Sequence, residues 1–250
     1  MKKLLLALTI AAFTTSALAA GPVVKTVVVK KAVNAIELDG AVAFTTDYRF
    51  RGISNSQQDA AVQGSITLNT DWGGHFSVWG SSVKLDEAGD NSDASLELDY
   101  TAGWLFDITD TVELDVGYTY YTYPQDNSDI NLDWGELYAD VGWEGAVAGV
   151  AFTDDGWGKS GKAMYGYLGY GHEFMDWLTL SAEVGNTWYD EFEFDNGQDR
   201  YMNYEVAATA TVLKRLDFKV AYVGTDLKKQ DIGGLDWAED AVVGTVTLNL

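Results

Sequence analysis

The sequence predicts an all-β fold: a transmembrane antiparallel up-and-down β-barrel of about 12 strands, with about 10 or 14 as alternatives. Apolar and polar residues alternate with a period of two from Asp39 to the end of the chain, which is typical of strands between two environments. The connections between strands alternate between long polar loops and tight turns. No segment approaches the roughly 20 consecutive apolar residues that a spanning helix needs.

The N-terminus predicts export. A basic start at Lys2 and Lys3 precedes a short apolar stretch and a small-x-small site that ends at Ala19. We therefore expect a signal peptide over residues 1–19, because the apolar stretch is too short for a transmembrane anchor. Residues 20–38 are expected to form a short N-terminal periplasmic extension, with a first strand as the alternative, and residues 39–250 to form the barrel.

Each strand is expected where the alternation is regular. In the first strand, Val42, Phe44 and Tyr48 fall on one face. Asp47 and the other odd-numbered residues of the strand fall on the opposite face. The clearest strands lie near residues 40–51, 62–69, 95–104, 112–120, 136–143, 178–184, 203–210 and 242–250, with weaker ones at 76–86, 146–153, 163–171 and 216–225.

The connections fall into two length classes. Long ones cover about residues 52–60, 87–93, 124–131, 154–162, 190–200 and 226–240, and short ones lie near 71–74, 107–110, 144–145, 173–176 and 214–215. Outer-membrane barrels have long external loops, short periplasmic turns and usually an even number of strands. A soluble β-sandwich, the main alternative fold, has no reason to sort its loops in this way.

Solvent decides which face of each strand points inward. In lipid the apolar row must face outward, so the charged row faces the lumen. The candidate pore-lining residues are Asp47, Arg49, Arg51, Glu97, Asp99, Glu136, Asp140, Glu183 and Glu205. Such carboxylates would be costly in a dry core, whereas a water-filled lumen accommodates them. They could also lie on the outer face of a soluble sandwich.

Arg49 and Arg51 form a charged cluster with Asp47, towards the external end of the first expected strand. We expect their guanidiniums to face Asp99, Asp140, Glu183 and Glu205 near mid-depth. One interpretation is a charged constriction that selects solutes by its field. The other is an internal salt-bridge network that stiffens the barrel and plugs it. The expected width does not decide between these two interpretations. A barrel of about 12 strands is wider than a barrel filled by its own side chains and narrower than a wide porin.

Large aromatic residues are expected at the two lipid–water boundaries, where Trp and Tyr collect. Trp72, Trp104, Trp143 and Trp177 fall near predicted periplasmic ends, and Tyr48, Tyr120 and Trp188 near external ends.

Composition excludes several functions. The chain has 16 Lys and Arg against 38 Asp and Glu, a formal net charge of -22, so nucleic acid is not an expected partner. With no Cys, thiol catalysis, disulfides and Cys-based metal sites are excluded. The two histidines, His75 and His172, fall at predicted periplasmic turns, away from the external rim where a barrel hydrolase would need one. We expect no catalytic residue, cofactor or resident metal, and the acidic loops at 86–93 and 190–197 lack EF-hand spacing.

The run Phe44–Ser54, with Ala61–Gly64 and Val78–Ser81, resembles the start of the TorF-family porins of Gram-negative bacteria. The likeness covers the first quarter of the mature chain well and the rest mainly by pattern. The resemblance implies an outer-membrane barrel with porin function, and it supplies no catalytic residues. One departure is the aliphatic last residue, Leu250, where such barrels commonly end on an aromatic.

From this we expect a monomeric channel of the bacterial outer membrane that passes small hydrophilic solutes passively, with an acidic lumen that favours cations. Its expected partners are outer-membrane lipid, lipopolysaccharide and the barrel-assembly machinery. The alternatives are a non-conducting structural or adhesive barrel, a barrel enzyme and a soluble exported β-sandwich.

Overall fold

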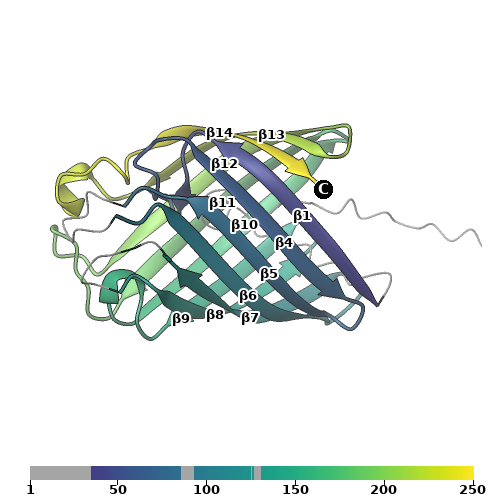
Figure 1. Ribbon diagram of the computed structural model, residues 1–250, viewed down its shortest axis with the longest axis horizontal. Helices are drawn as coiled ribbons and strands as arrows, with labels where there is room; N and C mark the ends of the chain where they lie inside the picture. The colour runs from purple at the N-terminus through teal and green to yellow at the C-terminus, as the bar shows by residue number, and fades with distance from the viewer. Residues whose placement is uncertain (1–34, 86–92, 125, 127–130) are drawn as a thin grey trace, which may run out of the picture.

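The chain forms a closed antiparallel barrel in a computed structural model that describes residues 35–85, 93–124, 126 and 131–250 (Figure 1). Within these residues, twelve strands make the wall. They are β1 (Ile36–Thr45), β4 (Ala61–Thr70), β5 (Gly74–Ser82), β6 (Leu96–Asp107), β7 (Val112–Thr122), β8 (Trp134–Trp143), β9 (Ala146–Thr153), β10 (Ala163–Met175), β11 (Leu178–Tyr189), β12 (Arg200–Val212), β13 (Leu216–Thr225) and β14 (Ala241–Asn249). The prediction of a 12-stranded up-and-down barrel is confirmed.

Each wall strand pairs with its neighbours in the chain, and the last strand pairs with the first. Ala41 lies opposite Asn249 and Thr45 opposite Thr245, which joins β1 to β14. The closure leaves no unpaired edge in the wall, which is the condition for placing strands in a medium that offers no hydrogen bonds.

The alternation seen in the sequence becomes an inner and an outer face. On β1, Val42 and Phe44 are 49% and 51% exposed, whereas Ala43 and Thr45 are 3% and 0% exposed. The exposed large apolar side chains therefore point away from the barrel axis, and the polar and small ones point into it. An apolar exterior of this kind marks a surface built for lipid or for a partner.

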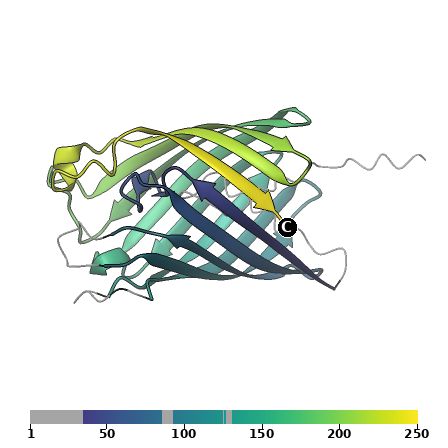
Figure 2. The same cartoon turned by 45° about the horizontal axis from the view of Figure 1, so that its top comes forward.

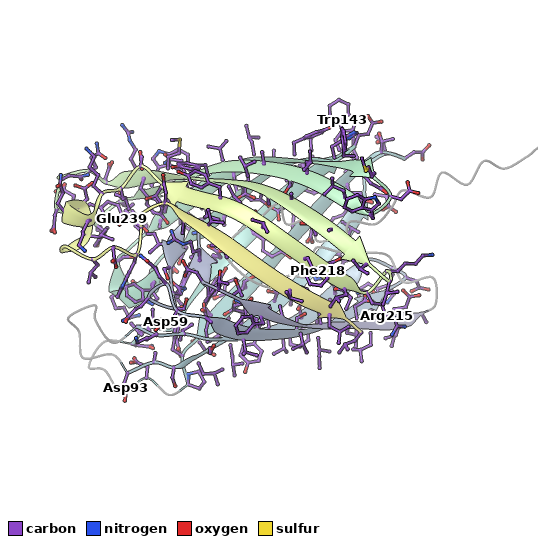
Figure 3. The ribbon with its side chains drawn as sticks, turned by 90° about the horizontal axis from the view of Figure 1, so that it is seen from above. Asp59, Asp93, Trp143, Arg215, Phe218 and Glu239 are labelled. Atoms are coloured by element: carbon purple, nitrogen blue, oxygen red, sulfur yellow. The ribbon has the colours of Figure 1, made fainter. Side chains whose placement is uncertain are left out.

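The two ends of the barrel differ in their connections. Glu239, Asp59 and Asp93 lie at the end that carries the long loops, and Trp143 and Arg215 lie at the opposite end (Figure 3). The turn at Glu144–Gly145 follows Trp143 and has φ values of 45° and 87°, the positive values that a tight two-residue hairpin turn requires. The long connections include two short 3-10 helices, η1 (Trp157–Lys159) and η2 (Lys229–Ile232).

The first strand differs from its expected bounds. The barrel begins at Ile36, before the expected boundary at Asp39, and the predicted signal peptide lies outside the described residues. The expectation that the same strand continues to Arg51 is wrong, because β1 ends at Thr45. Two further short strands follow, β2 (Arg49–Phe50) and β3 (Ile53–Ser54), which pair with each other as a separate hairpin.

No helix within the described part of the chain is long and apolar enough to cross a membrane.

Candidate functional site

Residues 46–60, the connection between β1 and β4, fold into the barrel mouth, and we call this segment the inward hairpin (Figure 2). Its tip is Arg51–Gly52, with φ values of 49° and 83°, so both tip residues adopt the left-handed backbone of a type I′ turn. A Cβ on Gly52 would lie 2.6 Å from Cγ2 of Thr225 and 2.9 Å from the Gly224 carbonyl oxygen. Only glycine lets the tip approach β13 so closely.

Asp47 holds the hairpin together from within. Its carboxylate accepts hydrogen bonds from Nε of Arg49 at 2.6 Å, from Oγ of Ser54 at 2.6 Å and from Oγ of Ser56 at 3.2 Å. Arg49 is fully buried, and its Nη1 donates to the carbonyl oxygens of Gly52 at 3.0 Å and Glu239 at 2.6 Å. This charged pair therefore stiffens the hairpin and ties it to the loop that precedes β14.

Arg51 connects the hairpin to the opposite wall. Its Nη2 donates to both carboxylate oxygens of Glu136 on β8, at 2.9 Å and 2.7 Å. Its guanidinium carbon lies 4.7 Å from the ring centre of Phe50 and 4.2 Å from that of Tyr165, within the range of a cation–π contact. Burial alone would lower the pKa of Arg51, but the charge of Glu136 overrides burial and raises it. Arg51 therefore stays charged inside the barrel.

Aromatic packing fills the space around the hairpin. The ring of Tyr48 lies 5.3 Å from that of Trp79, and Phe50 packs edge-on against Tyr121 and Trp134 at 5.7 Å and 6.1 Å. The expectation that Tyr48 marks the outer lipid boundary is wrong: Tyr48 is 3% exposed and belongs to this interior cluster, because the chain has left the wall before it reaches that residue. Burial, reinforced by the charge of Glu97, raises the pKa of the Tyr48 hydroxyl.

The loop of residues 226–240 covers the hairpin from the other side. The backbone N–H of Ser54 donates to the Trp237 carbonyl oxygen at 2.9 Å, and Nε2 of Gln58 donates to that of Asp236 at 2.7 Å. Together with the contacts to β5, β7, β8, β10 and β13, these bonds carry the hairpin across the lumen from one wall to the other.

The charged cluster is thus assembled differently from the expected arrangement. Arg49 and Arg51 lie on the hairpin rather than on the wall, and they pair with Asp47 and Glu136. Neither partner is one of the mid-depth acids Asp99, Asp140, Glu183 and Glu205 that were expected to face them. Both arginines lie in the interior, as the alternation predicted, but the chain leaves the wall after Thr45, and the hairpin carries them to other partners.

Four lumen carboxylates of the wall accept hydrogen bonds from tyrosines. Tyrosine hydroxyls donate to carboxylate oxygens at 2.7 Å (Tyr121 to Glu136), 3.1 Å (Tyr123 to Glu97), 3.3 Å (Tyr138 to Asp115) and 3.3 Å (Tyr165 to Glu183). Glu205 differs, because Nζ of Lys219 lies 2.7 Å from its Oε1. A hydroxyl is a neutral donor, so it satisfies a carboxylate without cancelling its charge.

Besides the tyrosines, three residues that make these lumen contacts, Asp115, His75 and Lys219, were not among the candidate pore-lining residues. Asp115 accepts from Tyr138 and also lies 3.0 Å from Nε2 of His75, which is buried on the inner face rather than placed in a turn. Lys219 is the third. All lie on the inward row of their strands, so the alternation contained the signal, but it could not say which inward residues would meet. Glu183 and Glu205 do meet, because they lie opposite each other on β11 and β12.

The lumen has two parts that differ in exposure. Between the hairpin and the loop end, inward residues such as Thr45, Gln63, Ser81 and Glu97 are at most 2% exposed. Towards the short-turn end the inward residues are mainly half-buried and include Ser65, Thr67, Ser77, Thr101, Asp140 and Ser181. Side chains therefore fill the part near the loop end, and the part near the turn end retains accessible space.

Glycines keep the tyrosine rings close to the wall. A Cβ on Gly185 would lie 2.1 Å from the Tyr165 hydroxyl oxygen, and one on Gly149 would lie 2.2 Å from Cε1 of Tyr167. These rings therefore lie over the neighbouring strand, in the space that a side chain would take, instead of projecting across the lumen.

The remaining expected aromatics lie on the outer surface. Trp72, Trp104, Trp143, Trp177, Tyr120 and Trp188 are between 37% and 57% exposed. Trp72 and Trp104 pack against each other near the short-turn end, with ring centres 4.5 Å apart.

No group of three or more His, Asp or Glu residues in the described chain is arranged to hold a metal ion. The acidic loop expected at 86–93 lies almost entirely outside the described residues, so this statement covers the loop at 190–197 but not that one.

Comparison with known proteins places this architecture among porins. A family model described as a bacterial protein of unknown function (Gcw_chp) matches residues 30–250. A structure of the NanC porin is similar with a TM-score of 0.52 and 11% identity, over 84% of this chain and 98% of that one. The KdgM porin is similar with a TM-score of 0.50 and 9% identity, over 85% and 98%. The comparison with curated proteins found no significant match. At these identities the two porin structures show the fold alone.

Proposed function

The chain belongs to the Gcw_chp family of bacterial proteins of unknown function, and we propose that it is a porin-like channel of the bacterial outer membrane. In this proposal small hydrophilic solutes cross by passive diffusion, and cations are favoured over anions. The resemblance to the TorF-family porins and the porin fold of NanC and KdgM support the channel class.

One observation carries the cation preference: several lumen carboxylates accept hydrogen bonds from neutral donors. Glu97 and Glu183 accept them from tyrosine hydroxyls, which bring no positive charge to the carboxylate. Lys219 is the wall cation seen to pair with a lumen acid, through Glu205. Fixed negative charge on a narrow lumen attracts cations and repels anions.

The outer surface supports a membrane location. Its exposed side chains form an apolar belt that includes Leu137, Leu168 and Val220, each about 60% exposed. Such a surface would be an aggregation hazard in water, whereas lipid covers it. The proposal includes export through the signal peptide at residues 1–19, assembly by the barrel-assembly machinery, contact with lipopolysaccharide and a monomeric state without cofactor or enzymatic activity.

A second candidate function rests on the inward hairpin. Because residues 46–60 cross the lumen and are held by the Arg51–Glu136 pair, the protein could serve as a non-conducting structural barrel. The two candidates differ in whether the hairpin ever leaves its position.

Planar-bilayer recording of the refolded protein separates them. We expect channel openings and, in a KCl gradient, a reversal potential that shows cation preference. Absence of any conductance from protein whose folding is verified by heat-modifiable gel migration would contradict the channel proposal. Openings with anion preference would contradict only the selectivity.

A further inference from the structure

The guanidinium of Arg51 is held by groups that belong to the barrel wall. Glu136 lies on β8 and supplies the carboxylate, and Tyr165 lies on β10 and supplies an aromatic face 4.2 Å away. Tyr121 on β7 donates to Oε1 of Glu136 at 2.7 Å and so fixes the direction of the carboxylate. A carboxylate beside an aromatic face is a complete recognition set for a planar cation. Its members come from three strands of the wall, β7, β8 and β10.

Arg51 occupies this set with imperfect geometry. Both of its bonds to Glu136 come from one nitrogen, Nη2, although a guanidinium pairs best with a carboxylate through two nitrogens. Its Nε is buried and has no hydrogen-bond partner. Its backbone φ is 49°, a value that residues other than glycine and asparagine adopt only at a cost in conformational free energy. The tether to the hairpin therefore prevents the alignment that an unattached guanidinium could reach.

We propose that Glu136, Tyr121 and Tyr165 form a binding site for guanidinium compounds, which the chain's own Arg51 occupies in this structure. Free solutes that carry a guanidinium exchange with Arg51 at this site, which we call the guanidinium site. The inference rests on the proposed channel function for its biological meaning: a solute that displaces Arg51 also releases the contact that ties the hairpin to β8.

The geometry favours guanidinium over ammonium. The flat faces of Tyr165 and Phe50 lie 4.2 Å and 4.7 Å from the guanidinium carbon of Arg51, and a planar cation can contact such faces while it bonds a carboxylate through its edge. An ammonium group is compact and strongly hydrated, so it gains less from aromatic faces in a buried place.

A variant that empties the site without removing its turn tests the proposal. Arg51→Gly deletes the guanidinium and suits the positive φ, because two consecutive glycines are favoured in a type I′ turn. Binding of methylguanidinium to the full chain in detergent is followed by thermal shift and by the fluorescence of Trp134, which stacks on Tyr121 at 4.3 Å. We expect saturable binding to Arg51→Gly that is about tenfold or more tighter than to the wild type, where Arg51 competes.

Three controls define the outcome. N-methylurea has the same shape without charge and should not bind, and methylammonium should bind more weakly than methylguanidinium. Adding Glu136→Gln to Arg51→Gly should abolish binding. Adding Asp217→Asn, which removes an inward carboxylate on β13 that bonds Asn249, should preserve it. Equal binding to the two double variants, or equal binding of the urea and the cation, would overturn the proposal.

Arg51→Asn provides the same measurement if the glycine variant does not fold, because asparagine tolerates a left-handed backbone. Binding is measured on protein in detergent and does not require ion conduction. A negative binding result is therefore distinct from a negative result for the channel proposal. A conducting protein that does not bind methylguanidinium contradicts only this inference.

Discussion

The loop-end and turn-end parts of the lumen are enclosed by the same strands, yet they have different contents. Near the loop end, Glu97 and Gln63 are 1% and 2% exposed, whereas Ser77 and Thr101, nearer the turn end, are half-buried. The wall of the loop-end part contributes large inward aromatic side chains, among them Trp79, Tyr121 and Trp134. The inward hairpin packs Tyr48 and Phe50 against them and adds Arg51, in this part only. A connection between two strands can therefore determine how much of a barrel is open.

The largest expected effect comes from separating the hairpin from the wall. Glu136→Gln leaves the buried charge of Arg51 without its ion partner, and removing one partner of a buried pair costs about 3–5 kcal/mol. We expect the free energy of unfolding in urea to fall by about that amount. Urea is preferable to guanidinium chloride here, since guanidinium is the expected ligand of the same site.

Asp59→Asn is the matched control, because it also removes one carboxylate of an ion pair on the hairpin. That pair, with Lys84, is exposed, so the change should cost less than about 1 kcal/mol. Similar losses for the two variants would show that the Arg51–Glu136 pair does not anchor the hairpin.

An intermediate effect is expected at mid-depth, where open space depends on rings that lie against the wall. In Gly149→Ala the new Cβ would lie 2.2 Å from Cε1 of Tyr167 and 2.2 Å from Oδ1 of Asp140. The ring must then move into the lumen, which should cost about 1–3 kcal/mol and reduce conductance. Gly142→Ala on the adjacent strand β8 is the control, since nothing lies within 4 Å of its Cβ position. Unchanged conductance in Gly149→Ala would show that Tyr167 does not limit the passage.

A smaller effect follows from removing one neutral donor. Tyr121→Phe deletes the hydroxyl that donates to Glu136 at 2.7 Å, while both bonds from Arg51 remain. We expect a loss of about 1 kcal/mol in urea unfolding. The reversal potential should not change, because the variant alters no charge. A shift of the reversal potential would contradict the role given to the tyrosines as neutral donors.

The smallest effect is a pH dependence at the loop end. Hydrogen bonds from the hydroxyls of Tyr222 and Tyr204 lower the pKa of Asp240. A lowered pKa in the folded state means that this contribution to stability is present above the unfolded pKa of about 4 and is lost as pH falls through the folded value. The Tm difference between wild type and Asp240→Asn should therefore be larger at neutral pH than in acid. A difference that is constant with pH would exclude this linkage.

The wall was predictable from the sequence because the outer and inner faces of a barrel strand alternate with a strict period of two. Val42 and Phe44 could be assigned to the outer face and Glu97 and Glu183 to the inner face without a structure. The alternating segments predicted about 12 strands, and the sorting of loops by length agreed with that number and distinguished the two ends.

The candidate site was predictable only in its residue types. Arg51 was expected to face acids, but its partner depends on two features of the backbone. The chain leaves the wall after Thr45, and a left-handed turn at Arg51 and Gly52 forms the tip of the hairpin. The sequence Phe50-Arg51-Gly52 continues the alternation, so period-two reasoning extended β1 too far. The aromatic character of Tyr48 suits both a membrane boundary and a buried cluster, and only the fold distinguishes them.

The central claim is that the inward hairpin closes an acidic lumen near its loop end. Its most direct test is the single-channel conductance of a protein in which residues 49–54 are replaced by an equally long Gly-Ser segment, recorded beside the wild type in a KCl gradient. We predict a larger conductance than that of the wild type, with cation preference retained. A folded variant that conducts no more than the wild type would contradict the claim.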